Sequence, residues 1–180
     1  FIRSPHPHAA IISIDATTAR AMNGVHAVYT QAEFSPHLTQ DRLPLGFRDK
    51  RLPDDVTQCV LAGDEVCYVG EAVAVVIADN RYVAEDAAEL IDVAYEILGS
   101  VSDCRAAIAP GAPRARGREG SNALMEFVQE YGDAERAFAQ APHVFRTGLF
   151  QHRGGAHPME GRGALARLDP AEDKLTIWTS

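Results

Sequence analysis

The sequence predicts an α+β fold in which strands and helices alternate early in the chain and a strand hairpin closes its later part. A strand, helix and strand pattern appears at 10–29 and returns at greater length at 72–97. After a stretch rich in arginine, proline and glycine the pattern changes, and 162–179 is typical of two strands around a polar turn. We therefore expect two parts, separated near residues 109–122.

The first pattern begins with a short run of β-forming residues at 10–15. A brief helix is expected at 17–22, and Gly24 supplies the left-handed stop that commonly ends a helix. Apolar residues then alternate at 25–29, which is the pattern of a strand with one buried face.

The second pattern has stronger signals. Residues 72–78 form a continuous apolar run, which predicts a strand buried on both faces. Asn80 is placed to cap a helix at 81–91, and 93–97 alternate as a strand. The residues expected to face inward from the helix are Val83, Ala84, Ala87, Ala88 and Ile91.

The remaining segments are less regular. Residues 34–58 show little periodicity, and a loop of that length usually carries function or lies against a partner. The chain also stops inside a strand pattern, so we expect it to be a piece of a larger protein. The later part should hold an extended run at 123–128, a helix from Asp133 to Gln140, a strand at 144–153, and hairpin strands at 162–168 and 174–179.

Composition excludes several classes of protein. A net charge of −8 and a pI near 5.3 argue against nucleic acid as a partner, because phosphate binding needs a concentrated cationic face. No apolar run approaches the roughly 18 residues that a membrane span needs. The first residues, with two prolines and two histidines, do not resemble a signal peptide, so we expect a cytoplasmic protein. The 3 cysteines have no metal-ligand spacing and are expected to be buried free thiols.

Several motifs together resemble the large, molybdopterin-binding subunit of the xanthine dehydrogenase, aldehyde oxidase and aerobic carbon monoxide dehydrogenase family. They occur in the family's order and cover nearly the whole chain. The matching segments are Phe1–Ala9 (FIRSPHPHA), Ile14–Asp15, Gly24–Val25, Val69–Ala74 (VGEAVA), Ala84–Glu89 (AEDAAE) and Met159–Gly163 (MEGRG).

The resemblance implies an α/β hammerhead domain at 1–108, a linker at 109–122, and the truncated start of a molybdenum-cofactor domain at 123–180. It implies a parent enzyme that oxidises carbon monoxide, an aldehyde, a purine or another heteroaromatic, with water as the oxygen source. Molybdenum-molybdopterin would lie in the parent subunit, and [2Fe-2S] clusters and FAD in partner subunits or domains. The assembled complex would be a homodimer. This chain would be a structural portion, inactive and without a cofactor by itself.

No catalytic residue is assigned, because the family's base and glycine-rich pterin contacts lie beyond this sequence. The family often has a glutamine six positions before the glutamate of the Met-Glu-x-Arg motif, where it bonds the metal's oxo group; Gly154 stands there. Gly154 and Gly155 either let the backbone approach the cofactor closely or form a bulge in a strand. They are the candidate cofactor-binding residues.

Two other classes of function remain open. His152, His157 and Glu160 offer a set of two histidines and one carboxylate that a small metal-dependent hydrolase could use. A free-standing ligand-binding module is the third class. Glu160 and Arg162, two positions apart, are read as an ion pair that fixes the entry to a strand rather than as catalytic groups.

Overall fold

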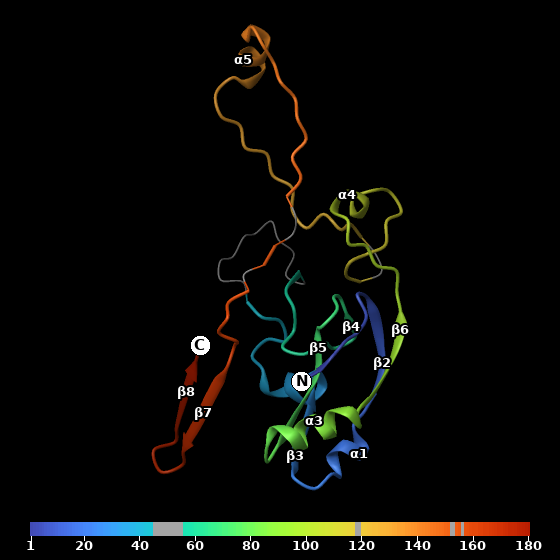
Figure 1. The fold of residues 1–180 in the computed structure, drawn as a ribbon, viewed down its shortest axis with the longest axis vertical. Coiled ribbons are helices and arrows are strands. Elements are labelled where there is room, and N and C mark those ends of the chain that lie inside the picture. Colours follow the sequence, from blue (N-terminus) through green and yellow to red (C-terminus); the bar gives the residue numbers. More distant parts are fainter. Residues whose placement is uncertain (45–55, 118–119, 152–153, 156) are drawn as a thin grey trace. The chain divides into compact units, whose positions relative to one another are not determined.

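The computed structural model describes residues 1–44, 56–117, 120–151, 154–155 and 157–180 (Figure 1). The chain divides into two compact units, 1–129 and 130–180, and each is described by itself. No helix within the described ranges is long and apolar enough to cross a membrane.

The described residues of the first unit form two sheets, and every pair of neighbouring strands is antiparallel. One sheet has the order β1, β5, β3, made of Ile2–Arg3, Ala72–Ala78 and Val25–Thr30. The other has the order β4, β2, β6, made of Glu65–Val66, Ala9–Asp15 and Asp92–Ile97.

The two predicted strand, helix and strand patterns are formed, and each contributes one strand to each sheet. Helix α1, Thr17–Arg20, leads from β2 into β3, which belongs to the other sheet. Helix α3, Arg81–Glu89, leads from β5 back to β6. In Figure 1 the two helices lie together at one end of the first unit, where they contact each other. The helices are therefore crossovers between sheets.

Two buried clusters hold this unit together, and small side chains dominate both. The cluster between the sheets joins Ala9, Ala62, Val66 and Val73, whereas the one beneath the helices joins Ala16, Ala19, Val28 and Ala87. The alanines of the second cluster let helices α1 and α3 pack closely against β3. Close packing of buried apolar side chains stabilises the folded state.

Helix α3 begins where the sequence predicts, because the Asn80 side chain accepts a hydrogen bond from the Val83 N–H at 3.1 Å. Gly24 adopts a φ of +85°, as expected for a residue that ends a helix. A side chain at position 24 would be strained by that angle and would meet the Asp79 carboxylate at 3.1 Å from its Cβ. Gly24 therefore fixes the approach of β3 to the end of β5.

Short elements were missed by the periodicity argument. Helix α2, Gln31–Phe34, ends on the first residue of the segment 34–58 that showed little periodicity, and the 3₁₀ turn Ser35–His37 lies inside that segment. Helix α4, Cys104–Ala107, begins at Asp103, whose carboxylate accepts from the Arg105 and Ala106 N–H groups. One helical turn is too short to show a period, so only its cap carries a signal.

The second unit contains helix α5, Ala134–Gln140, capped by Asp133 as predicted. Its hairpin joins β7, Ala164–Asp169, to β8, Lys174–Thr179, around a turn in which the Asp169 side chain accepts from Ala171 N–H at 3.0 Å. The strand predicted at 144–153 is absent from its described residues, 144–151. A strand needs a neighbour to satisfy its backbone, and the described residues offer it none.

Candidate functional site

The candidate cofactor-binding glycines lie in the second unit, in a segment without regular structure. Gly154 and Gly155 are both exposed. A Cβ added to Gly154 would meet nothing within 4 Å, and one added to Gly155 would lie 3.6 Å from the His157 Nε2. The backbone at this pair is therefore open to close approach by another group.

The residues of the proposed metal-dependent hydrolase are not brought together in the part of the chain that can be described. His157 and Glu160 are exposed, and His152 lies outside the described residues. Among the described residues no group of three His, Cys, Asp or Glu side chains is placed to hold a metal ion. Geometry thus gives this alternative no support.

The predicted ion pair between Glu160 and Arg162 is not formed. No hydrogen bond or ion pair within the described ranges joins these two exposed side chains. The prediction assumed an extended strand, in which residues two apart share a face. Strand β7 begins only at Ala164, so that geometry starts after both residues.

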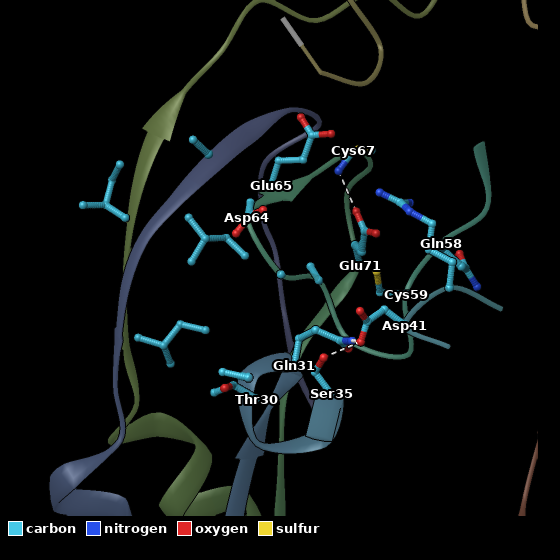
Figure 2. Close-up of a pocket in the computed structure, with 18 of the residues that line it drawn as sticks. Thr30, Gln31, Ser35, Asp41, Gln58, Cys59, Asp64, Glu65, Cys67 and Glu71 are labelled. Atoms are coloured by element: carbon cyan, nitrogen blue, oxygen red, sulfur yellow. Dashed lines mark hydrogen bonds between the residues drawn. The ribbon is translucent and has the colours of Figure 1, made fainter. Parts of the chain in front are cut away.

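A pocket of about 820 Å³ in the first unit gathers polar and charged side chains. Its apolar wall is β2, and its polar wall comes from α2 and from the segments around Gln58 and Glu71 (Figure 2). The charged lining residues are Arg20, Arg42, Arg116, Glu33, Asp41, Asp64, Glu65 and Glu71. Acidic groups outnumber basic ones.

Gln31, at the start of α2, organises one end of this pocket. Its side-chain oxygen accepts from the Leu61 N–H at 3.2 Å, and its Nε2 donates to Asp41 at 3.5 Å. Ser35 Oγ donates to the same Asp41 oxygen at 2.5 Å, and Figure 2 shows the three side chains converging. These bonds connect α2 to two loops that are far apart in sequence.

Glu33 is held nearby by Thr30, the residue that caps α2, and by Arg20 of α1. The Thr30 N–H and hydroxyl both donate to its carboxylate, and Arg20 donates to it at 2.5 Å. The hydrogen bond from the Thr30 side chain is the largest of the effects that lower the pKa of Glu33. This carboxylate therefore stays charged and acts as a cap.

Glu71 also lines the pocket, and it is 7% exposed. Its Oε2 accepts from the Cys67 N–H at 2.6 Å. Burial raises the pKa of Glu71, and it raises the pKa of the Cys67 thiol to about 12, with the negative charge of Glu65 adding to the effect. A thiol that resists ionisation is a poor nucleophile, so this pair stabilises the turn before β5 rather than offering covalent chemistry.

Most of the charged groups that line the pocket are thus bonded to other groups of the protein. Sequence reasoning missed Gln31 and Glu65 because long-range contacts of single side chains leave no periodic signal. Glu71 had a signal, since it belongs to the Val-Gly-Glu segment that carried the resemblance. The arrangement is that of a scaffold that fixes loops around a core.

Two family models match the chain in succession. The α/β hammerhead domain of aldehyde oxidase and xanthine dehydrogenase matches residues 1–99, and the molybdopterin cofactor-binding domain matches residues 117–180.

Curated relatives agree with these matches. The gamma subunit of the 6-hydroxypseudooxynicotine dehydrogenase complex from Paenarthrobacter nicotinovorans is 40% identical over 98% of this chain and 22% of its own length. The carbon monoxide dehydrogenase large chain from Afipia carboxidovorans is 37% identical over 99% of this chain and 23% of its own length. The chain thus spans less than a quarter of these two relatives.

A solved structure extends the likeness to the fold. Quinoline 2-oxidoreductase from Pseudomonas putida 86 superposes with a TM-score of 0.82 at 34% identity, over 98% of this chain and 22% of its own. Both the sequence order and the arrangement of strands and helices are therefore those of known proteins. The chain belongs to the aldehyde oxidase and xanthine dehydrogenase family, and carries a hammerhead domain followed by a molybdopterin cofactor-binding domain.

Proposed function

We propose that this chain is the N-terminal structural portion of the large subunit of a molybdenum hydroxylase, and that it is not catalytic by itself. The hammerhead domain would occupy 1–108, a connecting segment 109–122, and the start of the cofactor domain 123–180. The observation that carries the proposal is the pair of family matches, 1–99 and 117–180, in that order. A pocket whose charged groups are mostly bonded to other groups of the protein agrees with a scaffolding role.

The parent enzyme is proposed to oxidise carbon monoxide, an aldehyde, a purine or another heteroaromatic, with oxygen taken from water. The names of the relatives support this range, because they include a 6-hydroxypseudooxynicotine dehydrogenase, a carbon monoxide dehydrogenase and a quinoline 2-oxidoreductase. Partner subunits or domains would carry [2Fe-2S] clusters and FAD, and the complex would be a cytoplasmic homodimer. The gamma-subunit relative is named as part of a complex, which favours such partners.

Gly154 and Gly155 are proposed to present backbone groups to the molybdenum cofactor. Their exposure and the open space at Gly154 support this, since a side chain there would occupy that space. When bound, the cofactor would supply the oxidation chemistry. The two glycines would contribute only backbone groups that the cofactor can approach closely.

Metal analysis of the parent enzyme, purified with its partner subunits, tests the proposal. We expect molybdenum and pterin in the wild-type complex and lower cofactor content in Gly154→Val and Gly155→Val. Gly148→Val is the matched control, because Gly148 is exposed, has no neighbour within 4 Å and lies in the same segment. A wild-type complex without molybdenum would overturn the function. Full cofactor content in both valine variants would overturn only the role of the glycines.

A further inference from the structure

Within the first unit, residues 99–117 and 120–122 are bonded at several points to the strands and loops that precede them, although their composition is that of a linker. One end is held by His8, which is 2% exposed. Its Nδ1 lies 2.8 Å from the Gly99 carbonyl oxygen, and its backbone oxygen accepts from the Leu98 N–H at 3.0 Å. The chain therefore leaves β6 along a fixed path.

Glu65 holds a later residue of the segment, Gly117. Both oxygens of its carboxylate lie within hydrogen-bond reach of the Gly117 N–H, at 3.0 and 2.9 Å. The same carboxylate lies 3.2 Å from the His8 Nε2. One side chain on β4 thus lies between His8, near the start of the chain, and Gly117, in the connecting segment.

Asn122 closes the segment upon itself. Its Nδ2 donates to the carbonyl oxygens of Ala107 and Pro113 at 2.9 and 2.8 Å. Its Oδ1 accepts from the Ala115 N–H at 2.9 Å and from Arg114 Nη1 at 3.1 Å. The amide has two donor hydrogens and two acceptor lone pairs, so these four bonds use its full capacity.

A third contact ties the segment to the loop that precedes β4. Arg116 Nη1 donates to the Thr57 carbonyl oxygen at 3.0 Å. In addition, a Cβ on Gly99 would lie 3.1 Å from the Pro113 Cβ, so the two limbs of the segment pack against each other. Figure 1 shows α4 and its flanking loops beyond the end of β6.

We infer that residues 99–117 and 120–122 form a strap of defined structure, and that Glu65 and Asn122 are its positioning residues. The strap spans the interval between the two family matches, which end at residue 99 and resume at 117. Gly117, the first residue of the cofactor-domain match, is bonded to a hammerhead strand through Glu65. Proline, glycine and arginine in this segment shape a bound loop, whereas the same composition usually marks a flexible spacer.

Hydrogen exchange of the assembled parent enzyme tests the hydrogen bond from the Gly117 N–H to the Glu65 carboxylate. In the wild type, the peptide that contains Gly117 should exchange slowly. Glu65→Ala should speed that exchange roughly tenfold, because the amide loses a charged acceptor. Glu65→Gln should restore protection, since the glutamine oxygen accepts from Gly117 while its amide group faces His8. Asp64→Asn is the control, because it removes the neighbouring exposed charge and leaves Glu65 in place.

Limited trypsin digestion gives a second readout, since cleavage after Arg114 or Arg116 needs a loosened strap. Asn122→Ala should increase cleavage at these sites without changing the exchange of helix α3. If Glu65→Ala does not assemble, Asn122→Ala and Glu65→Gln still decide the question. Equal exchange of the Gly117 peptide in the wild type and in Glu65→Ala would overturn the inference, as would unchanged cleavage in Asn122→Ala.

Discussion

The side-chain oxygen of Gln31 accepts a hydrogen bond from the backbone N–H of Leu61 at 3.2 Å, in a buried setting. Leu61 is 1% exposed and Gln31 is 8% exposed, so water cannot readily replace either partner. The bond connects the first turn of α2 to the segment that leads into β4, 30 residues later in the sequence.

Replacing Gln31 by alanine should lower the free energy of unfolding by about 1 to 3 kcal/mol, because the Leu61 N–H would remain buried without an acceptor. Urea unfolding of the two proteins, followed by circular dichroism, measures the difference. Gln40→Ala, at an exposed position, is the control and should change stability little. A loss no larger than the control's would show that the bond contributes nothing.

Glu71 should make stability depend on pH in a definite direction. Burial raises its pKa above the ordinary value of 4.5, so the folded chain binds this proton more readily than the unfolded chain does. The cost of the buried charge is present above the raised pKa and disappears as the pH falls through it.

Glu71→Gln should therefore have a higher Tm than the wild type at about pH 7.5, and the gain should shrink towards about pH 4.5. Thermal unfolding at a series of pH values measures this. Glu89→Gln, at an exposed position of α3, should show no such trend. A gain that grows on acidification would contradict the assigned direction.

The cysteines should differ in reactivity. Burial raises the pKa of Cys67 to about 12, whereas Cys104 is exposed at the start of α4; the sequence had predicted buried thiols throughout. Iodoacetamide at about pH 8 should label Cys104 first and leave Cys67 largely unmodified, because the thiolate is the reactive form. Peptide mass spectrometry gives the order, and faster labelling of Cys67 would count against this assignment.

The contribution of the α3 N-cap to stability can be measured by replacing Asn80. Asn80→Ala should cost about 1 kcal/mol of stability, because the Val83 N–H would lose its acceptor. Asn80→Asp keeps a side-chain oxygen at the same place and should retain most of the stability. Denaturant midpoints of the three proteins decide, and equal losses in both variants would show that the cap bond is unimportant.

How far the sequence predicts this fold depends on the length of each element. Helix α3 and strand β8 appear close to their expected bounds, because a cap and an alternating run each leave a local signal. The strand at 144–153 failed because pairing is a property of two segments, and one sequence segment cannot reveal whether its partner is present. Helix α2 was missed because a single turn has no period to detect.

The residues of the candidate site also differ in whether a local sequence signal marks them. Gly154 was singled out by its place in a motif, and its contact with a cofactor stays a prediction. No local sequence pattern identifies Glu65, because its partners His8 and Gly117 are 57 and 52 residues away along the chain. Contacts of that range become visible only when the strands have been placed.

Each strand, helix and strand pattern contributes one strand to each sheet, and this couples the folding of the two patterns. Since β2 and β6 share one sheet while β3 and β5 share the other, neither half of the pattern can satisfy its hydrogen bonds alone. Severing the backbone between the halves should leave two fragments that are disordered apart and regain order on mixing, as complementing pieces do. Folding should accordingly be all-or-none across these strands, and slow for its size because the decisive pairings close long loops.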